Sequence, residues 1–286
     1  MPLGQQASLG YPSNNMSFVY RPPPVTPGLF IRSALFFAGQ VVVTIVIAPF
    51  VMLAIALPYR ARYRIVYQWS RFNTWWLGVT CKLTHEVQGE ENIPSRPAIV
   101  LCKHQSAWET ICLQHYFSPQ VWVLKRELLW LPIFGWALAM LRPIAIDRSA
   151  GRDAMSQVLE QGVARLESGC WVVVFPEGTR VPAGSRRRYK AGGATLAART
   201  GVPVVPVAHD AGLYWPRNSF IKYPGVVRLV VGPAIKTRGK SASEINREAE
   251  IWIEGTVERL LASKKETFSS PPSQGETSAN GAEKTG

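Results

Sequence analysis

Residues 97–109 read Pro-Ala-Ile-Val-Leu-Cys-Lys-His-Gln-Ser-Ala-Trp-Glu, an apolar run that passes directly into a polar turn. A short apolar run of this kind, bounded by turn residues, is typical of a buried β-strand. Similar runs and several helical patterns follow it, the runs at 121–125, 170–175, 202–208 and 226–231 and the helical patterns at 150–168, 191–200 and 241–263. This alternation predicts an α/β fold with a mostly parallel central sheet flanked by helices.

The composition restricts the class of protein. The chain has 286 residues, of which 47% are hydrophobic, so it can bury one sizeable core. Its net charge of +13 favours acidic partners such as anionic lipid or a phosphorylated substrate. No nucleic-acid-binding motif is present, and the four cysteines form neither a C-x-x-C pair nor a metal-ligand spacing with histidine. We therefore expect no nucleic-acid partner and no metal site built on cysteine.

Composition also divides the chain into four parts. Residues 1–28 are rich in proline and polar residues and predict a flexible arm, and residues 264–286 lack apolar content and predict a disordered tail. Between them, we expect a membrane-associated helical segment at 29–80 and the α/β domain at 81–263.

The helical segment begins with a long uncharged run. From Ser33 to Tyr59 there are 27 residues without a charge, about 40 Å as one helix, which exceeds the roughly 30 Å of a bilayer core. Pro49 interrupts the run and Pro58 closes it, so the axis should bend. Two interpretations remain open at this point, a kinked transmembrane helix and a bent segment that dips into one leaflet.

An aromatic stripe follows the uncharged run. Five residues fall on one helical face, with three arginines along one flank: Ile65, Trp69, Phe72, Trp76 and Val79, with Arg60, Arg64 and Arg71. The pattern resembles an interfacial amphipathic helix on anionic headgroups, although such a stripe is more often a packing surface. The basic residues after the apolar run also favour a cytoplasmic location for the rest of the chain. We expect a membrane-associated protein, at the inner membrane of a bacterium.

His104 and Glu109 are the candidate catalytic pair. His104 follows the strand-like run that ends at Cys102, and ligands of open α/β sheets bind at the carboxyl ends of strands. A regular helix would place residues five apart about 140° from each other, so the pair can meet only if the chain turns between them. The carboxylate could then fix the imidazole tautomer and leave the other ring nitrogen as a base. A histidine that caps a helix beside a surface glutamate is the alternative.

Ser106 invites a different chemistry, that of a serine hydrolase. Its surroundings lack the Gly-x-Ser-x-Gly turn that presents such a nucleophile, so a role as helix N-cap is favoured.

Two later segments offer groups for an anion. Phe175-Pro-Glu-Gly-Thr-Arg180 follows a buried-strand pattern, and in it Gly178 allows a sharp turn while Thr179 and Arg180 supply donors. Arg148 comes after the short apolar run 144–146 and could also fork onto a phosphate. Solvated surface arginines are the alternative in both cases.

Taken in order, four segments resemble the glycerolipid acyltransferase family, specifically the 1-acyl-sn-glycerol-3-phosphate acyltransferases. The family's motifs are similar to 104–109, where Glu109 stands in place of the usual aspartate, to 144–148, to 175–180 residue for residue, and to the proline-bearing run 202–206. The resemblance covers about residues 80–235.

The resemblance implies the reaction, and it implies no metal and no other cofactor, because the thioester is already activated. His104, oriented by Glu109, would deprotonate the free sn-2 hydroxyl of a lysophosphatidate, whose oxygen then attacks the thioester of acyl-CoA or of acyl carrier protein to give phosphatidic acid. Substrate binding is carried over to Arg148, Glu177, Gly178, Thr179 and Arg180. Glu177, itself an anion, would contact glycerol hydroxyls or orient an arginine. Another lysolipid or glycerol-3-phosphate as acceptor, a lipid hydrolase that uses Ser106, and a membrane scaffold remain as alternatives.

Overall fold

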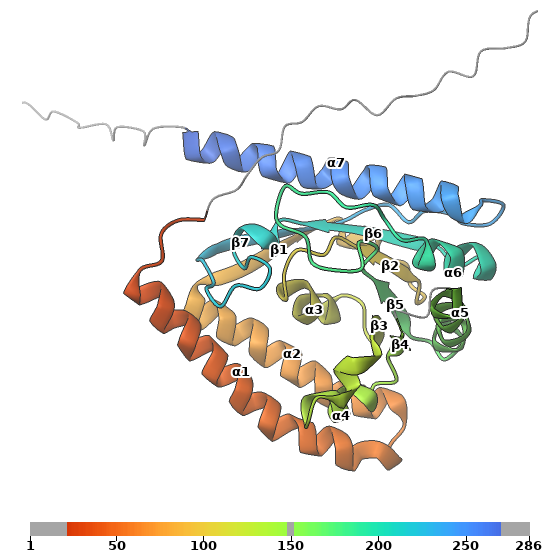
Figure 1. Cartoon of the computed structure of the whole chain (residues 1–286), viewed down its shortest axis with the longest axis horizontal. Coiled ribbons are helices and arrows are strands. Elements are labelled where there is room, and N and C mark those ends of the chain that lie inside the picture. Colours follow the sequence, from red (N-terminus) through yellow and green to blue (C-terminus); the bar gives the residue numbers. More distant parts are fainter. Residues whose placement is uncertain (1–21, 148–151, 270–286) are drawn as a thin grey trace, which may run out of the picture.

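The computed structural model describes residues 22–147 and 152–269, and a seven-stranded sheet forms its centre (Figure 1). The strand order is β1-β7-β6-β2-β5-β3-β4, and every neighbouring pair is parallel except β6 with β7. The strands are β1 Leu83–Gln88, β2 Ile99–Cys102, β3 Gln120–Lys125, β4 Ile144–Ile146, β5 Trp171–Val174, β6 Val204–His209 and β7 Gly225–Val231. The mostly parallel sheet predicted from the sequence is confirmed.

The central strands are apolar because both of their faces are covered. Every residue of β2, β5 and β6 is buried, as expected for parallel strands between two helical layers. Strand β6 lies inside the sheet although it contains Pro206, which has no N–H to donate to a neighbouring strand. The proline is accommodated because the antiparallel pairing with β7 begins only at Val207.

Helices cover the sheet on two sides (Figure 1). On one face lie α5 Arg152–Glu167, α6 Gly192–Thr200 and α7 Ala242–Ser269, which pack on one another and on β4, β5 and β6. Opposite them, α2 Tyr59–Cys81 packs on β1 and on the short α3 Trp108–Cys112. Another short helix, α4 Phe134–Ala139, packs on α1 Pro27–Leu53. Helix α7 continues to Ser269, through the first residues of the tail expected from 264.

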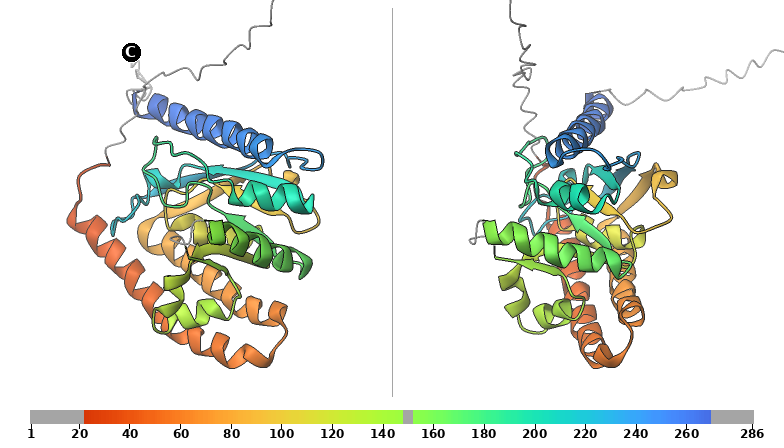
Figure 2. Two further views of the ribbon diagram at one scale, coloured as in Figure 1. Left: turned by 45° about the vertical axis from the view of Figure 1, so that its right-hand side comes forward. Right: turned by 90° about the vertical axis from the view of Figure 1, so that its right-hand side faces the viewer.

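Helices α1 and α2 form a hairpin (Figure 2). Helix α1 continues through Pro49, and the chain reverses over the 3₁₀ turn Ala54–Ala56 before α2 begins at Tyr59. The stretch Pro27–Ala56 is apolar and long enough to cross a membrane by length and composition. In the structure, however, the reversal at 54–58 returns the chain to the domain, and Leu53 at this tip is 79% exposed.

The aromatic stripe of α2 faces α1. The indole of Trp69 donates to Thr44 Oγ1 at 2.9 Å, and that of Trp76 donates to the Leu35 carbonyl at 3.0 Å. Gly39 leaves room for the second indole, because a Cβ at this position would lie 2.1 Å from Trp76 Nε1. The interpretation of the stripe as a membrane surface is therefore wrong for these two indoles, which pack between the helices.

Candidate active site

His104 lies in the turn between β2 and α3, at the carboxyl end of a central strand. The backbone on both sides of the imidazole is fixed by neighbouring segments. The Lys103 N–H donates to the Val207 carbonyl at 3.0 Å, and the His104 carbonyl accepts from the Val181 N–H at 2.8 Å. The position of the ring is thus set by the sheet and by the loop that follows β5.

Glu109 meets His104 across this turn. His104 Nδ1 lies 2.7 Å from Glu109 Oε1, which also accepts from the N–H groups of Gln105 and Ser106, at 2.9 Å each. The contact expected from the sequence is present, because the chain turns before Trp108 and Glu109 lies in the first turn of α3. The longer glutamate side chain therefore reaches the imidazole.

The environment of Glu109 determines the tautomer of His104. Burial alone would raise the pKa of Glu109, but His209, His104 and the Ser106 N–H outweigh burial and hold that pKa below its usual value. Glu109 is therefore ionised at neutral pH and can only accept, so Nδ1 carries the proton. Nε2 is left as an acceptor, in the state that a general base requires.

Ser106 does not lie as a nucleophile would. It is fully buried, and its Oγ accepts from the Trp108 N–H at 3.2 Å, at the start of α3. This bond resembles the predicted capping role, although Ala107 occupies the N-cap position itself.

An apolar cavity of about 350 Å³ opens at His104. The imidazole is 14% exposed and stacks on Phe175, with ring centroids 4.0 Å apart. Apolar side chains from several elements form most of the wall, among them Ile47 and Val51 of α1, Val66 and Trp69 of α2, Trp122 and Leu124 of β3, and Phe134 and Leu138 of α4. The hairpin and the α/β domain therefore build this cavity together.

The cations that line the cavity come from the loop after β5 and from the end of β3. Gly178 and Arg180 line it, as does Lys125, to which the sequence assigned no role. Gly178 has a φ of +70°, and a Cβ there would approach Lys190 Cε to 3.0 Å, so both conformation and space favour glycine. Thr179 is half-buried and is not among the lining residues.

Glu177 departs from the expectation. Its side chain is fully buried, and Oε1 lies 3.2 Å from Lys103 Nζ and 3.5 Å from the His104 backbone nitrogen. Its cationic partner is a lysine, so the expectation that it orients an arginine is wrong. Burial is the largest influence on Glu177 and raises its pKa, which the nearby Lys103 only partly offsets.

The sequence reasoning missed the buried ion cluster around Lys103. Lys103 is fully buried, and its ammonium donates to Glu254 of α7 at 2.7 Å and to the Ser185 carbonyl at 3.2 Å. Tyr189 donates to the same Glu254 oxygen at 2.9 Å. The one sequence signal is a lysine directly after a buried strand. The cluster joins the turn that carries His104 to α7.

His209 was missed as well. It is fully buried, and the Ala211 N–H donates to its Nδ1 at 3.2 Å, so Nε2 carries the proton and donates to the Lys103 carbonyl at 2.8 Å. Burial lowers the pKa of His209, in keeping with a neutral ring. A histidine at the end of the apolar run 202–208 was the only signal. This ring supports the backbone directly before His104.

Arg148, the remaining predicted binding residue, lies outside the described residues. The preceding strand β4 ends at Ile146, and the Asp147 N–H donates to Gln157 Oε1 at 3.1 Å. Within residues 22–147 and 152–269, no group of three or more His, Cys, Asp or Glu side chains could hold a metal ion.

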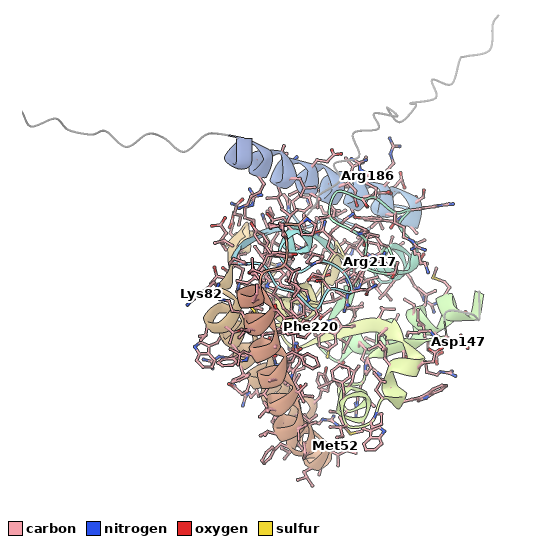
Figure 3. All side chains as sticks on the ribbon, turned by 60° about the vertical axis from the view of Figure 1, so that its left-hand side comes forward. Met52, Lys82, Asp147, Arg186, Arg217 and Phe220 are labelled. Carbon is pink, nitrogen blue, oxygen red and sulfur yellow. The ribbon has the colours of Figure 1, made fainter. Side chains whose placement is uncertain are left out.

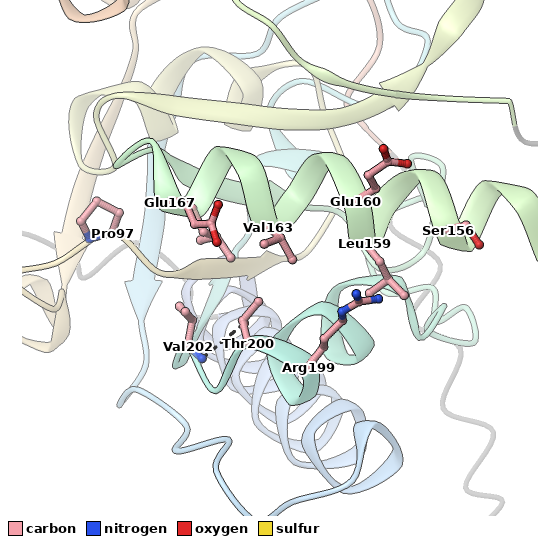
Figure 4. Close-up of a pocket in the computed structure, with 10 residues that line it drawn as sticks. Pro97, Ser156, Leu159, Glu160, Val163, Glu167, Arg199, Thr200 and Val202 are labelled. Atoms are coloured by element: carbon pink, nitrogen blue, oxygen red, sulfur yellow. Dashed lines mark hydrogen bonds between the residues drawn. The ribbon is translucent and has the colours of Figure 1, made fainter.

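A larger hollow, of about 850 Å³, lies between α5 and α6 (Figure 4). Pro97 and Val202 line it, and they precede the amino ends of β2 and β6. His104 follows the carboxyl end of β2, so the hollow lies at the other edge of the sheet. None of its lining residues belongs to the candidate site.

Comparison with known proteins gives consistent results. A family model described as Acyltransferase matches residues 84–210. A 1-acyl-sn-glycerol-3-phosphate acyltransferase of Pseudomonas aeruginosa is 49% identical over 71% of this chain and 81% of its own length. The human alpha form is 37% identical over 56% of this chain and 58% of its own length. A crystal structure of a 1-acyl-sn-glycerophosphate (LPA) acyltransferase from Thermotoga maritima superposes with a TM-score of 0.67 and 26% identity, covering 81% of this chain and 95% of that one.

Proposed function

The chain belongs to the 1-acyl-sn-glycerol-3-phosphate acyltransferases, and we propose that His104 is the base of its reaction and Glu109 the group that orients it. The reaction transfers an acyl group to lysophosphatidic acid and yields phosphatidic acid. The donor is a thioester, for which acyl-CoA and acyl carrier protein are both candidates.

The proton transfers follow from the tautomer of His104. Nε2 takes the proton of the sn-2 hydroxyl as the alcohol oxygen attacks the thioester carbonyl. The carbon–sulfur bond then breaks, and the leaving thiolate recovers the proton from Nε2. Ionised Glu109 stabilises the imidazolium between these steps, since its oxygen lies 2.7 Å from Nδ1. Base catalysis of this kind contributes roughly 10²- to 10⁴-fold.

The apolar cavity is suited to a fatty acyl chain. Its wall is largely aliphatic and aromatic, and it reaches from His104 to the hairpin. Burial of each methylene favours binding by about 0.8 kcal/mol. An acyl chain of the donor in this cavity would bring the thioester carbonyl to the imidazole, and the acyl chain of the acceptor would bring the glycerol there.

Cations at the polar end of the cavity would bind the acceptor phosphate. Arg180 and Lys125 line the cavity that contains His104, so we assign the phosphate to them, with Arg148 as a candidate from its sequence motif. Gly178 allows the turn that presents Arg180, and Thr179, next to it, is a candidate donor from its sequence motif. Glu177 acts by positioning, through Lys103 and the His104 backbone, and does not contact the substrate.

The hairpin would place the site at the membrane. Residues from Phe30 to Leu57 expose many large apolar side chains, and the chain returns to the domain after the tip. Both observations favour a hairpin that dips into one leaflet, with the α/β domain on the cytoplasmic side. The acceptor and the product, both lipids, would then stay in the bilayer.

The shared cavity of His104 and Arg180 is the observation that carries the proposal. Purified protein in lipid–detergent micelles should form phosphatidic acid from palmitoyl-CoA and lysophosphatidic acid, and acceptor competition will rank glycerol-3-phosphate and other lysolipids. We expect Arg180→Ala to raise the KM for the acceptor more than that for the donor. Arg187→Ala, an exposed arginine of the same loop that does not line the cavity, is the control. Equal effects of Arg180→Ala on both KM values would contradict the assignment.

A further inference from the structure

Three phenylalanines form an exposed cluster where α1 meets the loop before β7. Phe30 and Phe37 of α1 are 54% and 51% exposed, and Phe220 of the α/β domain is 39% exposed. The Phe220 ring lies 5.5 Å from that of Phe30 and 5.9 Å from that of Phe37, between centroids. Figure 3 shows Phe220 beside α1 and Arg217 farther along the same loop. A segment of the catalytic domain thus extends the apolar surface of the hairpin.

The loop is held firmly against α1, so the exposure of Phe220 is a fixed feature. The Lys222 N–H donates to Ser33 Oγ at 3.0 Å, and Lys222 Nζ donates to the Phe220 carbonyl at 2.7 Å. The same ammonium lies 5.0 Å from the ring centroid of Phe36 and 4.7 Å from that of Trp215. Cation–π contacts of this kind are strongest when the cation is shielded from water, and Lys222 is only 3% exposed.

The two segments that carry the cluster contain basic residues but no acidic ones. Arg32 and Arg217 are exposed beside it, and neither residues 22–59 nor residues 211–227 contain an acidic side chain. Exposed aromatic rings together with basic residues are the composition of a surface at the headgroup level of an anionic bilayer.

We propose that Phe30, Phe37 and Phe220, with Arg32 and Arg217, form a bilayer contact of the catalytic domain at headgroup depth, here called the Phe220 patch. The inference rests on the proposed leaflet position of the hairpin. Helix α1 is about 40 Å long, whereas one leaflet offers roughly half of a 30 Å hydrocarbon core. Helix α1 must therefore lie obliquely, with its tip in the hydrocarbon, and the Phe220 patch fixes its shallow end.

Fluorescent probes at three positions test the Phe220 patch. All four native cysteines are buried, so a thiol-reactive, polarity-sensitive dye will label introduced cysteines selectively. The first position is Phe220→Cys. The second is Val42→Cys, which replaces a 61% exposed side chain of α1, and the third is Ser241→Cys, an exposed site before α7. With vesicles of phosphatidylglycerol and phosphatidylethanolamine, emission should shift to the blue at 220 and 42 and stay unchanged at 241.

The outcomes distinguish a failure of the Phe220 patch from a failure of the proposed leaflet position of the hairpin. A shift at 42 without one at 220 would overturn the Phe220 patch and leave the hairpin proposal intact, and the patch would then have another occupant, such as a protein. No shift at 42 would overturn the leaflet position itself. Equal shifts at all three positions would mean unspecific adsorption and would also overturn the Phe220 patch.

Kinetics with two forms of the acceptor give a second readout. Phe220→Ser should raise the ratio of the KM for vesicle-borne lysophosphatidate to the KM for a short-chain, water-soluble one, by roughly 5-fold. Ile251→Ser, which removes a 57% exposed side chain from α7, is the control and should leave the ratio unchanged. An unchanged ratio in Phe220→Ser would contradict the Phe220 patch.

Discussion

Two buried glutamates contact His104 from different loops, and their surroundings differ. Glu109, from the turn after β2, binds the imidazole, while Glu177, from the loop after β5, lies against the backbone nitrogen of the same residue. Glu109 accepts from two backbone N–H groups besides the imidazole, whereas one oxygen of Glu177 has no hydrogen-bond partner among the residues that the structure describes. Accordingly, the pKa of Glu109 is lowered, despite burial, and that of Glu177 is raised by burial.

Glu109 and Glu177 are both fully buried, but the difference in their hydrogen bonds gives them different roles. A carboxylate that is solvated by backbone donors stays ionised and can stabilise an imidazolium. A carboxylate held mainly by one lysine costs free energy to ionise and serves to fix a loop. Both tasks concern the same base, so substitutions can distinguish them.

Glu109→Gln should have the largest effect. The amide oxygen could still accept from His104, but the neutral amide cannot stabilise an imidazolium, and its nitrogen would face the Ser106 N–H that now donates to Oε2. We therefore expect kcat to fall roughly 10²- to 10⁴-fold. Steady-state kinetics of folded protein, checked by circular dichroism, will measure this. A loss below 10-fold would remove the distinction between the two acids.

Lys103→Met should have the second largest effect, which is a loss of fold stability. It leaves Glu177 and Glu254 buried without their lysine, and removing one partner of a buried pair costs about 3 kcal/mol or more in free energy of unfolding. The double variant Lys103→Met/Glu254→Met replaces one pair by apolar contact and should recover part of that loss. Urea titration compares the two, and a double variant no more stable than the single one would contradict the cluster.

Glu177→Gln should reduce kcat by about 10-fold at most, because backbone contacts to Val181 and Val207 still hold the base. Its main effect concerns pH. The raised pKa of Glu177 means that its stabilising contribution is present below about 4.5 and is lost as pH rises through the folded-state pKa. The lowered pKa of Glu109 gives the opposite sign, with stability present above 4.5 and lost as pH falls through the folded-state pKa.

Thermal melts from about pH 2 to about pH 8 follow both acids, because the contribution of Glu109 is lost below its ordinary pKa and that of Glu177 above it. Glu177→Gln should remove the loss of stability on the alkaline side, and Glu109→Gln the loss on the acid side. The same pH dependence in both variants would show that the two carboxyls share one environment.

Ser106→Ala should have the smallest effect. It removes one hydrogen bond to the Trp108 N–H, at a cost of about 1 kcal/mol in stability, and kcat should change by no more than about 3-fold. A trapped acyl-serine, sought by mass spectrometry after incubation with the donor, would instead favour a hydrolase.

The same contrast explains how much could be read from the sequence. The contact of His104 with Glu109 was predictable because they are only five positions apart, where a recognisable strand passes into a helix. The cluster around Lys103 was not, since Lys103 and Glu254 are 151 positions apart and nothing in a single sequence pairs them. His209 is 106 positions from the carbonyl that it supports.

The rest of the fold could also be predicted only in part from the sequence. Apolar periodicity identified the central strands and the helices of one face. It could not say what the α2 stripe faces, because an indole that packs on α1 has the same spacing as one in lipid. Strand β1 was missed, since three of its six residues are exposed and its partner β7 is far along the chain.

The central claim is that His104 is the base, and the kcat of His104→Ala tests it most directly. With lysophosphatidate and palmitoyl-CoA at saturation, a folded His104→Ala protein should lose roughly 10²- to 10⁴-fold in kcat while Ser106→Ala stays near the wild type. A His104→Ala protein that retains most of the wild-type kcat would contradict the account.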